Sequence, residues 1–332
     1  MSFMSYAEVR QWAKQSYTPL DALLRTRAMP PWPADPKIGA FSNSEFMTDA
    51  EIDLLISWTK SGLPRGNGDY QGPELRGEWG GGKPDHVFEL PVYTVPEDTV
   101  GEYRTFQVAT NFSEDRWIIG SEIRPGNKYA VRGILGGVLG VFQPGQTTLW
   151  HPASYGTRLK KGATVDVRIH YYKEEGIEET DQSHIGVFFA KNDAHRRLIH
   201  EAPMRAAPFT IAAGTADFEV MTHFKFPEDG EIVSLMPIMH FRGKRVAYTL
   251  RFPDGAEQRL LVIPEWNPNW KYRYVLREPV SAAKGSVVTA SAVFDNSEAN
   301  LKNPDPWSDV DMGPAGETFE GWLGYTLTQS SE

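Results

Sequence analysis

A histidine and three other polar residues recur at every second position of one short segment, as Asp166, Arg168, His170 and Tyr172. Side chains of a β-strand alternate between its two faces, so these four would share one face while apolar neighbours occupy the other. An imidazole titrates near neutral pH and suits general acid or base catalysis. We therefore expect His170 and Asp166 to be catalytic. Arg168, Tyr172 and the more distant Arg132 would bind or orient a substrate. The alternative is a structural histidine that is hydrogen-bonded within its strand.

A second histidine, His240, ends an apolar segment in which Ile238 lies two residues earlier. The two side chains would lie on the same side of a strand and line an apolar pocket with a single polar group. We expect His240 to be catalytic, and Ile238 and Met236 to contact the substrate. An alternative is a soft ion such as Cu(I), held by His240 with Met236 and Met239. His223 would then be a further ligand. In a third interpretation the methionines only pack the core.

Two glutamates near the C-terminus, Glu317 and Glu320, are further candidates. A carboxyl group in an apolar cleft has a raised pKa and can act as an acid. We take Glu320 as a catalytic candidate, with surface charges as the alternative for both residues.

The elements that must position these residues change in character along the chain. Residues 1–65 are predicted to be helical, because Ser5-x-x-Glu8 and Thr48-x-x-Glu51 are capping boxes that each open an amphipathic helix. A glycine-rich linker over 66–84 follows. Beyond it the apolar period falls to two, which is typical of strands. The predicted strands are 87–90, 103–109, 116–123, 129–135, 164–172, 185–190, 217–226, 232–241, 245–252, 258–263, 272–276, 287–294 and 320–328.

Short strands at regular spacing, without alternating helices, indicate antiparallel sandwiches. We predict a mainly β protein of two antiparallel jelly-roll-like β-sandwich domains with a small N-terminal helical segment. The domains would span 85–203 and 204–332, with a proline-rich hinge at 201–208.

Composition excludes several classes of protein. The chain of 332 residues has no cysteine, which excludes disulfides, Cys-ligated zinc, iron–sulfur clusters and a covalently attached haem. Its net charge of −9 disfavours a nucleic-acid partner. No run approaches the ~18 apolar residues of a membrane helix, so we expect no membrane partner. The first residues lack a secretory pattern, which predicts a cytoplasmic protein, or a periplasmic one if a leader has been removed.

Several motifs, in order along nearly the whole chain, resemble one family. They are 29–36 and 47–51 near the N-terminus, then 114–117, 124–127 and 168–171, then 236–244, 266–270 and 294–297 with 303–304. The later motifs resemble the copper type II, ascorbate-dependent monooxygenases, relatives of the peptidylglycine α-hydroxylating and dopamine β-monooxygenases. The first two resemble the end of a c-type cytochrome module. The resemblance implies two jelly-roll-like β domains with a cleft between them, behind a cytochrome-c-like remnant in 1–65.

The resemblance also implies where two copper ions would be held. The electron-transfer copper of the family takes two adjacent histidines and a third in a His-Tyr motif. In this sequence Arg132-Gly133 occupies the positions of the two adjacent histidines, and of the three ligands only His170 is retained. The oxygen-binding copper takes a His-x-His pair and a methionine, whose places hold Ile238-Met239-His240 and Gly321. An arginine does not deprotonate and repels a cation. We therefore expect copper and haem both to be lost and the protein to hold no metal.

These observations favour a repurposed member of the family. The leading hypothesis is a metal-independent acid–base enzyme, of isomerase, cyclase or lyase type, acting on a small or medium, partly apolar metabolite between the two domains. One alternative is a non-catalytic ligand-binding or scaffold protein. The other is a residual copper-dependent monooxygenase or oxidoreductase. The substrate and the oligomeric state do not follow from the sequence.

Overall fold

The computed structural model describes residues 5–15, 20–68, 79–173, 176–192 and 196–328. The chain divides into two compact units. One comprises Met1–Trp32 and Ser44–Gly80, and the other comprises Pro33–Asn43 and Gly81–Glu332. The first is helical, and the second is built from β-strands with one 3₁₀ turn.

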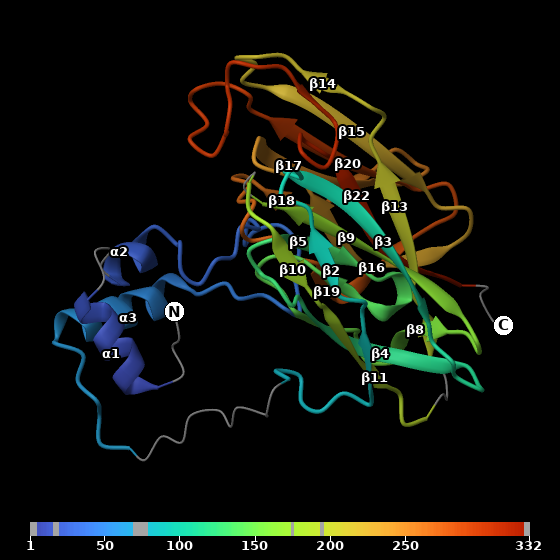
Figure 1. Ribbon diagram of the computed structural model, residues 1–332, viewed down its shortest axis with the longest axis horizontal. Helices are drawn as coiled ribbons and strands as arrows, with labels where there is room; N and C mark the ends of the chain where they lie inside the picture. The colour runs from blue at the N-terminus through green and yellow to red at the C-terminus, as the bar shows by residue number, and fades with distance from the viewer. Residues whose placement is uncertain (1–4, 16–19, 69–78, 174–175, 193–195, 329–332) are drawn as a thin grey trace. The chain divides into compact units, whose positions relative to one another are not determined.

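The helical unit contains α1 (Tyr6–Gln15), α2 (Leu20–Arg25) and α3 (Asp49–Lys60) (Figure 1). The predicted capping box of α3 is present, with Thr48 and Glu51 capping reciprocally. At the start of α1 the Ser5 hydroxyl accepts from the Glu8 amide and donates to the Glu8 carboxylate. Leu24, Ile52 and Ile56 form the small core of this unit. Most of the predicted linker, residues 69–78, lies outside the described part of the chain.

The first sandwich packs two main sheets face to face. One has the order β1-β11-β4-β8-β12 with β7 beside β4, the other has the order β3-β9-β5-β6, and a small ribbon pairs β10 with β2. Its elements are β1 (His86–Glu89), β2 (Tyr93–Val95), β3 (Gly101–Ala109), β4 (Arg116–Arg124), β5 (Val131–Leu135), η1 (Gly137–Leu139), β6 (Val141–Phe142), β7 (Thr148–Trp150), β8 (Tyr155–Leu159), β9 (Thr164–Tyr172), β10 (Glu179–Asp181), β11 (His184–Phe189) and β12 (Arg197–Leu198).

The core of this sandwich follows from strand alternation. Val167, Ile169 and Tyr171 of β9 are buried against Ile123 of β4 and Ile185 of β11. The opposite face of β9, with the predicted polar residues, is thereby turned away from this core, as the sequence predicts.

The second sandwich has the same two-layer construction. Its sheets have the orders β13-β22-β16-β19 and β15-β20-β17-β18, with β14 paired to β21. Its elements are β13 (His200–Arg205), β14 (Thr210–Ile211), β15 (Phe218–Lys225), β16 (Gly230–Ile238), β17 (Gly243–Arg251), β18 (Glu257–Ile263), β19 (Tyr274–Ala282), β20 (Val287–Phe294), β21 (Val310–Asp311) and β22 (Glu320–Leu327).

The predicted fold class is confirmed: the protein is mainly β, with two antiparallel β-sandwiches of jelly-roll type and a small N-terminal helical segment. Each strand predicted from alternation overlaps an observed one. The hinge predicted over 201–208 is wrong. His200–Arg205 instead form β13, which pairs with β22. Its one proline, Pro203, is tolerated because β13 is an edge strand, where a ladder amide is dispensable.

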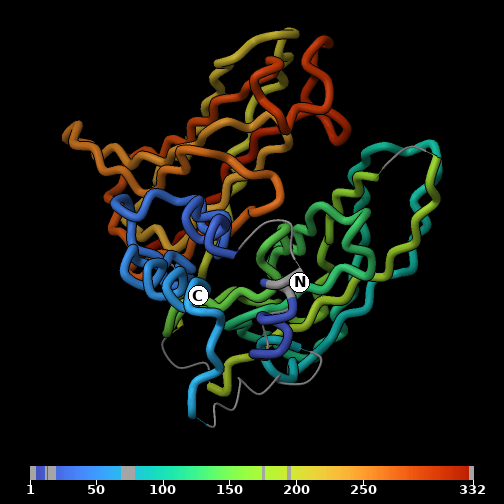
Figure 2. Tube along the Cα trace, turned by 90° about the vertical axis from the view of Figure 1, so that its left-hand side faces the viewer, coloured from blue at the N-terminus to red at the C-terminus, as the bar shows by residue number. Residues whose placement is uncertain are grey.

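A separate apolar cluster joins the two sandwiches. Val141 and Leu149 of the first pack with Met236, Ile238 and Val275 of the second. The two sandwiches form two lobes of the tube, one from teal to yellow-green and one from yellow to red (Figure 2). The β3-β9-β5-β6 sheet and the β13-β22-β16-β19 sheet face each other beside this cluster, which positions the pocket described below.

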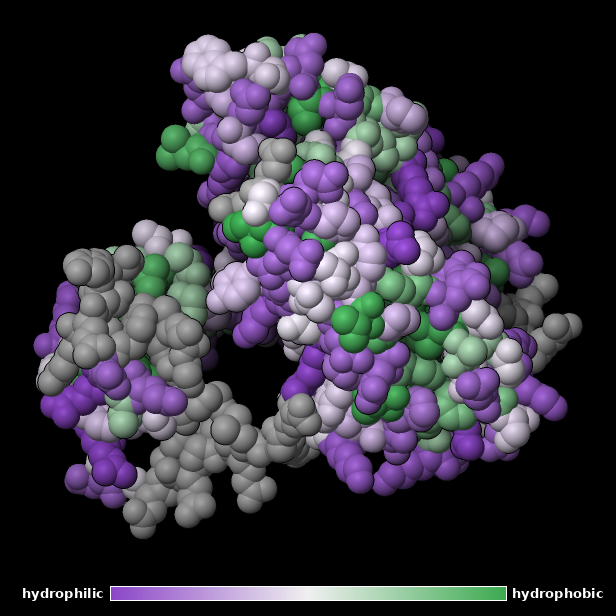
Figure 3. All heavy atoms as spheres, in the orientation of Figure 1, coloured by the Kyte–Doolittle hydropathy of each residue, from purple (hydrophilic) through white to green (hydrophobic). Residues whose placement is uncertain are grey.

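Hydrophobic residues on the face shown in Figure 3 are scattered among hydrophilic ones. In the described residues, no helix has the length and apolarity that crossing a membrane requires.

Candidate functional site

A pocket opens where the two sandwiches meet, with a cavity volume of about 20 Å³. It is lined by Tyr103, Arg132, Gly133, Leu135, Gln143, Arg168, His170, Ile238, His240, Lys271 and Glu320. A second hollow shares Arg132, His170, His240 and Lys271, and it adds Tyr172, Phe241, Pro268 and Asn269. The structure therefore brings both predicted histidines to one site, from opposite sandwiches.

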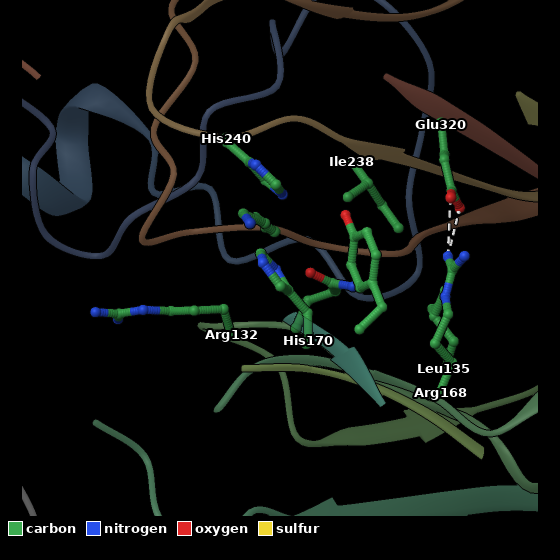
Figure 4. Close-up of a pocket in the computed structure, with 11 residues that line it drawn as sticks. Arg132, Leu135, Arg168, His170, Ile238, His240 and Glu320 are labelled. Atoms are coloured by element: carbon green, nitrogen blue, oxygen red, sulfur yellow. Dashed lines mark hydrogen bonds and ion pairs between the residues drawn. The ribbon is translucent and has the colours of Figure 1, made fainter. Parts of the chain in front are cut away.

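His170 and His240 lie against each other in the centre of this pocket (Figure 4). Their ring centroids are 4.7 Å apart and their planes differ by 17°, which is a stacked arrangement. His170 lies in β9 opposite Gly133 of β5 and Tyr103 of β3. The missing side chain at Gly133 makes room for the Gln143 side chain, because a Cβ there would lie 3.1 Å from Gln143 Nε2.

One loop holds both imidazoles in place. His170 Nε2 lies 2.9 Å from the Pro314 carbonyl oxygen, and His240 Nδ1 lies 3.0 Å from the Gly316 carbonyl oxygen. A carbonyl oxygen only accepts, so each of these ring nitrogens donates. The second nitrogen of each neutral ring then carries a free lone pair, and His240 Nε2 is buried without a partner. Two imidazoles with fixed tautomers thus present unprotonated nitrogens.

Glu317 fixes this loop and is a structural residue. Its carboxyl group accepts from the backbone amides of His240, Arg242 and Thr318. Burial raises the pKa of Glu317 to about 7, although the three amides oppose that rise by favouring the carboxylate. The side chain that was a candidate acid therefore acts as an anchor between β16, β17 and the loop.

Both imidazoles are neutral at physiological pH. Burial, the Lys271 charge and the Arg132 charge lower the pKa of His170 to about 3. Burial, His170 and Lys271 lower the pKa of His240 well below its ordinary value. The neutral forms follow first from burial and then from the cationic surroundings.

Lys271 is the buried cation of the site and was not predicted. It precedes β19 in an irregular segment whose backbone is tied to the first sandwich, because the Lys271 amide donates to the Pro144 carbonyl at 2.8 Å. Only 4% of the residue is exposed. Burial lowers the pKa of Lys271 to about 8, and Glu317 opposes this by attraction.

Glu320 is paired with arginine and forms the other end of the pocket. Arg168 Nη2 donates to both Glu320 oxygens, at 2.8 and 3.0 Å, and the Trp322 indole donates to Oε2 at 2.8 Å. The Arg168 guanidinium also lies 5.0 Å from the centre of the Tyr103 ring. Glu320 therefore lines the pocket, with its charge already balanced by Arg168.

Several predicted site residues lie elsewhere. Asp166 is exposed near the start of β9 and lines neither hollow, because it is four positions from His170 and beyond the end of the pocket. Met236 packs in the cluster between the sandwiches. His223 is exposed on β15, where its Nδ1 lies 3.0 Å from Thr289 Oγ1, so it is not placed to join His240. Tyr172 lines the second hollow, and Ile238 and Arg132 line the first.

The donor set does not fit a copper ion. Within the described part of the chain, no three His, Cys, Asp or Glu side chains gather as metal ligands. The imidazoles are stacked, so their lone pairs run in nearly parallel planes instead of converging, and Lys271 and Arg132 lie beside them. A side chain at position 321 would point into the second sandwich and away from the pocket, because its Cβ would lie 2.8 Å from the Ala290 Cβ.

Sequence patterns missed Lys271, Tyr103 and Gln143 as pocket residues. Tyr103 lies on a predicted strand, and its pairing with His170 follows only from the strand register. Lys271 directly follows the Trp-Asn-Pro-Asn-Trp motif at 266–270, but no alternation there distinguishes a buried lysine from an exposed one.

Comparisons with known proteins give only distant structural likenesses. No family model and no curated protein matches the sequence. The chain is similar to a structure of infectious bursal disease virus Gx strain, with a TM-score of 0.26, 7% identity and 75% of each chain covered. It is also similar to the major capsid protein P2 from bacteriophage PM2, with a TM-score of 0.31, 9% identity, and 74% of this chain and 99% of that chain covered. Likenesses at these scores carry no inference about function.

Proposed function

We propose that this protein is a metal-independent acid–base enzyme that moves a proton on a small, partly apolar metabolite bound between the two sandwiches. The observation that carries the proposal is the pair of neutral imidazoles, His170 and His240, each held by a backbone carbonyl and each with a free ring nitrogen. Reactions of isomerase, cyclase or lyase type begin with such a proton transfer.

The proposed step is proton abstraction beside a carbonyl group. One free imidazole nitrogen takes the proton, the C–H electron pair moves into an enolate, and the imidazole becomes an imidazolium. The same imidazolium returns the proton at another carbon in an isomerase, or a leaving group departs from the enolate in a lyase. Lys271 and Arg132 line the pocket and would stabilise the negative charge that develops on oxygen.

The test uses hydrogen–deuterium exchange, which requires no knowledge of the product. Small carbonyl compounds with apolar bodies are incubated with the protein in D₂O, and replacement of C–H by C–D is followed by proton NMR. We expect exchange in at least one compound, and a loss of at least about 100-fold in His170→Ala or His240→Ala. His223→Ala is the matched control, since this exposed histidine lies outside the pocket. Full exchange in both pocket variants would overturn the assignment.

A ligand-binding protein is the second candidate, and the lowered pKa of His170, about 3, favours it because a weaker base abstracts protons more slowly. It predicts that a compound binds in the pocket and that wild-type protein catalyses no exchange in it.

We also propose that the scaffold is that of the copper monooxygenases with its redox chemistry lost. The proposal is supported by Arg132 and Lys271, two cationic side chains that line the pocket with His170 and His240. Copper well below one per chain after loading with the ion is the expected result, and stoichiometric copper with ascorbate-dependent oxygen uptake would contradict it.

A further inference from the structure

Lys271 is a buried ammonium without a counter-ion among the described residues. Its side chain lines both hollows, and no hydrogen bond or ion pair joins its Nζ to another residue in the described ranges. An unpaired buried charge is costly, so its retention in a pocket needs a compensating group.

Arg132 is a second cation that lines both hollows, with its side chain directed away from Ile238 and Glu320 (Figure 4). It lies at an irregularity where β5 pairs with β9, between Val131 and Gly133. Its Nε is buried without a partner, as is Nε2 of the nearby His240. Three nitrogens that lack partners therefore belong to one pocket, and two of them are on cationic side chains.

The nearby carboxylates are already engaged. Glu320 pairs with Arg168 and accepts from Trp322. Glu317 is the carboxylate that attracts Lys271 electrostatically, but its oxygens accept three backbone amides. The side chains that line the pocket thus carry an excess of positive charge, with Arg132 and Lys271 unpaired.

The remaining wall is apolar. Leu135, Ile238 and Tyr103 line the pocket. Figure 4 shows Ile238 between His240 and the Arg168–Glu320 pair, with Leu135 beside Arg168. A ligand that satisfies both regions carries one anionic group and an apolar body.

We infer that the pocket binds a monocarboxylate with an apolar body, whose carboxylate is held by Lys271 and Arg132 while the body contacts Leu135 and Ile238. This inference rests on the proposed function, whose substrate class it names. A carboxylate accepts hydrogen bonds from two cationic donors at once. A phosphate is less suited, because the glycine-rich segment after β5 leads into the 3₁₀ turn η1 and β6, without a helix whose amides would cradle it.

Isothermal titration calorimetry of the full chain at pH 7 tests this with benzoate and its uncharged isostere benzamide. We expect benzoate to bind at least tenfold more tightly than benzamide. Lys271→Met and Arg132→Met should each weaken benzoate binding at least tenfold, and Lys271→Arg should retain most of it. Lys173→Met is the matched control, because Lys173 is a buried lysine outside the pocket whose Nζ donates to the Glu97 carbonyl. Circular dichroism verifies that each variant folds.

Equal affinity for benzoate and benzamide would overturn the inference, as would full benzoate affinity in both methionine variants or tighter binding of inorganic phosphate. The outcome is separable from the proposed function. Benzoate has no exchangeable C–H beside its carboxylate, so its binding reports only recognition. If the wild type does not bind benzoate but exchange is still lost in His170→Ala, the substrate class is refuted and the proposed function is not.

Discussion

The two imidazoles of the pocket make folding stability depend on pH. The pKa of His170 is about 3 in the folded protein and near 6.5 in the unfolded chain. Between these values the unfolded state binds more protons, so the free energy of unfolding falls as the pH is lowered through this window. The slope is at most about 1.4 kcal/mol per pH unit for each such histidine. Glu317, with its pKa raised to about 7, has the opposite effect between pH 4.5 and 7.

Replacing His170 by Gln isolates one of these contributions. We expect the variant to lose less stability than the wild type between pH 6.5 and 4.5, by up to about 1.4 kcal/mol per pH unit. The measurement is urea unfolding followed by tryptophan fluorescence at several pH values. His223→Gln, at an exposed position, should follow the wild-type pH dependence. Parallel curves for His170→Gln and the wild type would show that His170 is not neutralised by its surroundings.

At the scale of elements, the loop over 312–317 positions the site. Its Pro314 and Gly316 carbonyls hold the two imidazoles, and Glu317 binds the loop to the backbone at His240 and Arg242. A Cβ at Gly316 would lie 2.1 Å from the Asp311 carbonyl oxygen, a contact that real side chains do not make. The close approach of this backbone therefore requires glycine.

Gly316→Ala should displace the loop and with it the imidazole orientations. We expect deuterium exchange to fall at least tenfold while circular dichroism still reports a β protein, because the loop contributes no strand to the main sheets. Gly313→Ala is the control, since a Cβ there meets nothing within 4 Å. An unchanged rate in Gly316→Ala would separate the loop from the function of the site.

The elements also show how far sequence alone leads. Alternation predicted the long strands, and it predicted the face of β9 that carries Arg168 and His170, because burial on one face imposes a period of two. It did not predict the strands of two or three residues, which are too short for a period, nor the five-residue β8, nor the edge strand β13, where Pro203 concealed the pairing. Lys271 and the loop carbonyls could not be predicted, because they are buried by long-range packing, which leaves no local pattern in the sequence.

At the scale of the whole molecule, the site depends on how the two sandwiches are joined. Met236 is fully buried in the cluster that joins them, next to Val141 and Leu149 of the first sandwich. This explains why a methionine expected to contact the substrate instead packs: its side chain fills the junction beside the pocket.

Met236→Ala should lower the free energy of unfolding by about 2–5 kcal/mol, the usual cost of truncating a buried methionine. Scanning calorimetry is the measurement, and we expect the unfolding transition to broaden as the two sandwiches uncouple. Met221→Ala is the matched control, because Met221 is 53% exposed on β15 and its truncation should change little. A loss below about 1 kcal/mol in Met236→Ala would contradict the role of the cluster.

The stacked imidazoles come from different halves of the chain, His170 from β9 of the first sandwich and His240 from the end of β16 in the second. Neither sandwich carries both histidines, so the stacked imidazoles require both halves of the chain. A recombination event that exchanged one sandwich for that of a diverged relative would break the pair even where both halves still fold. A chimaera therefore keeps the stacked imidazoles only where it supplies both His170 and His240 in matching sandwiches.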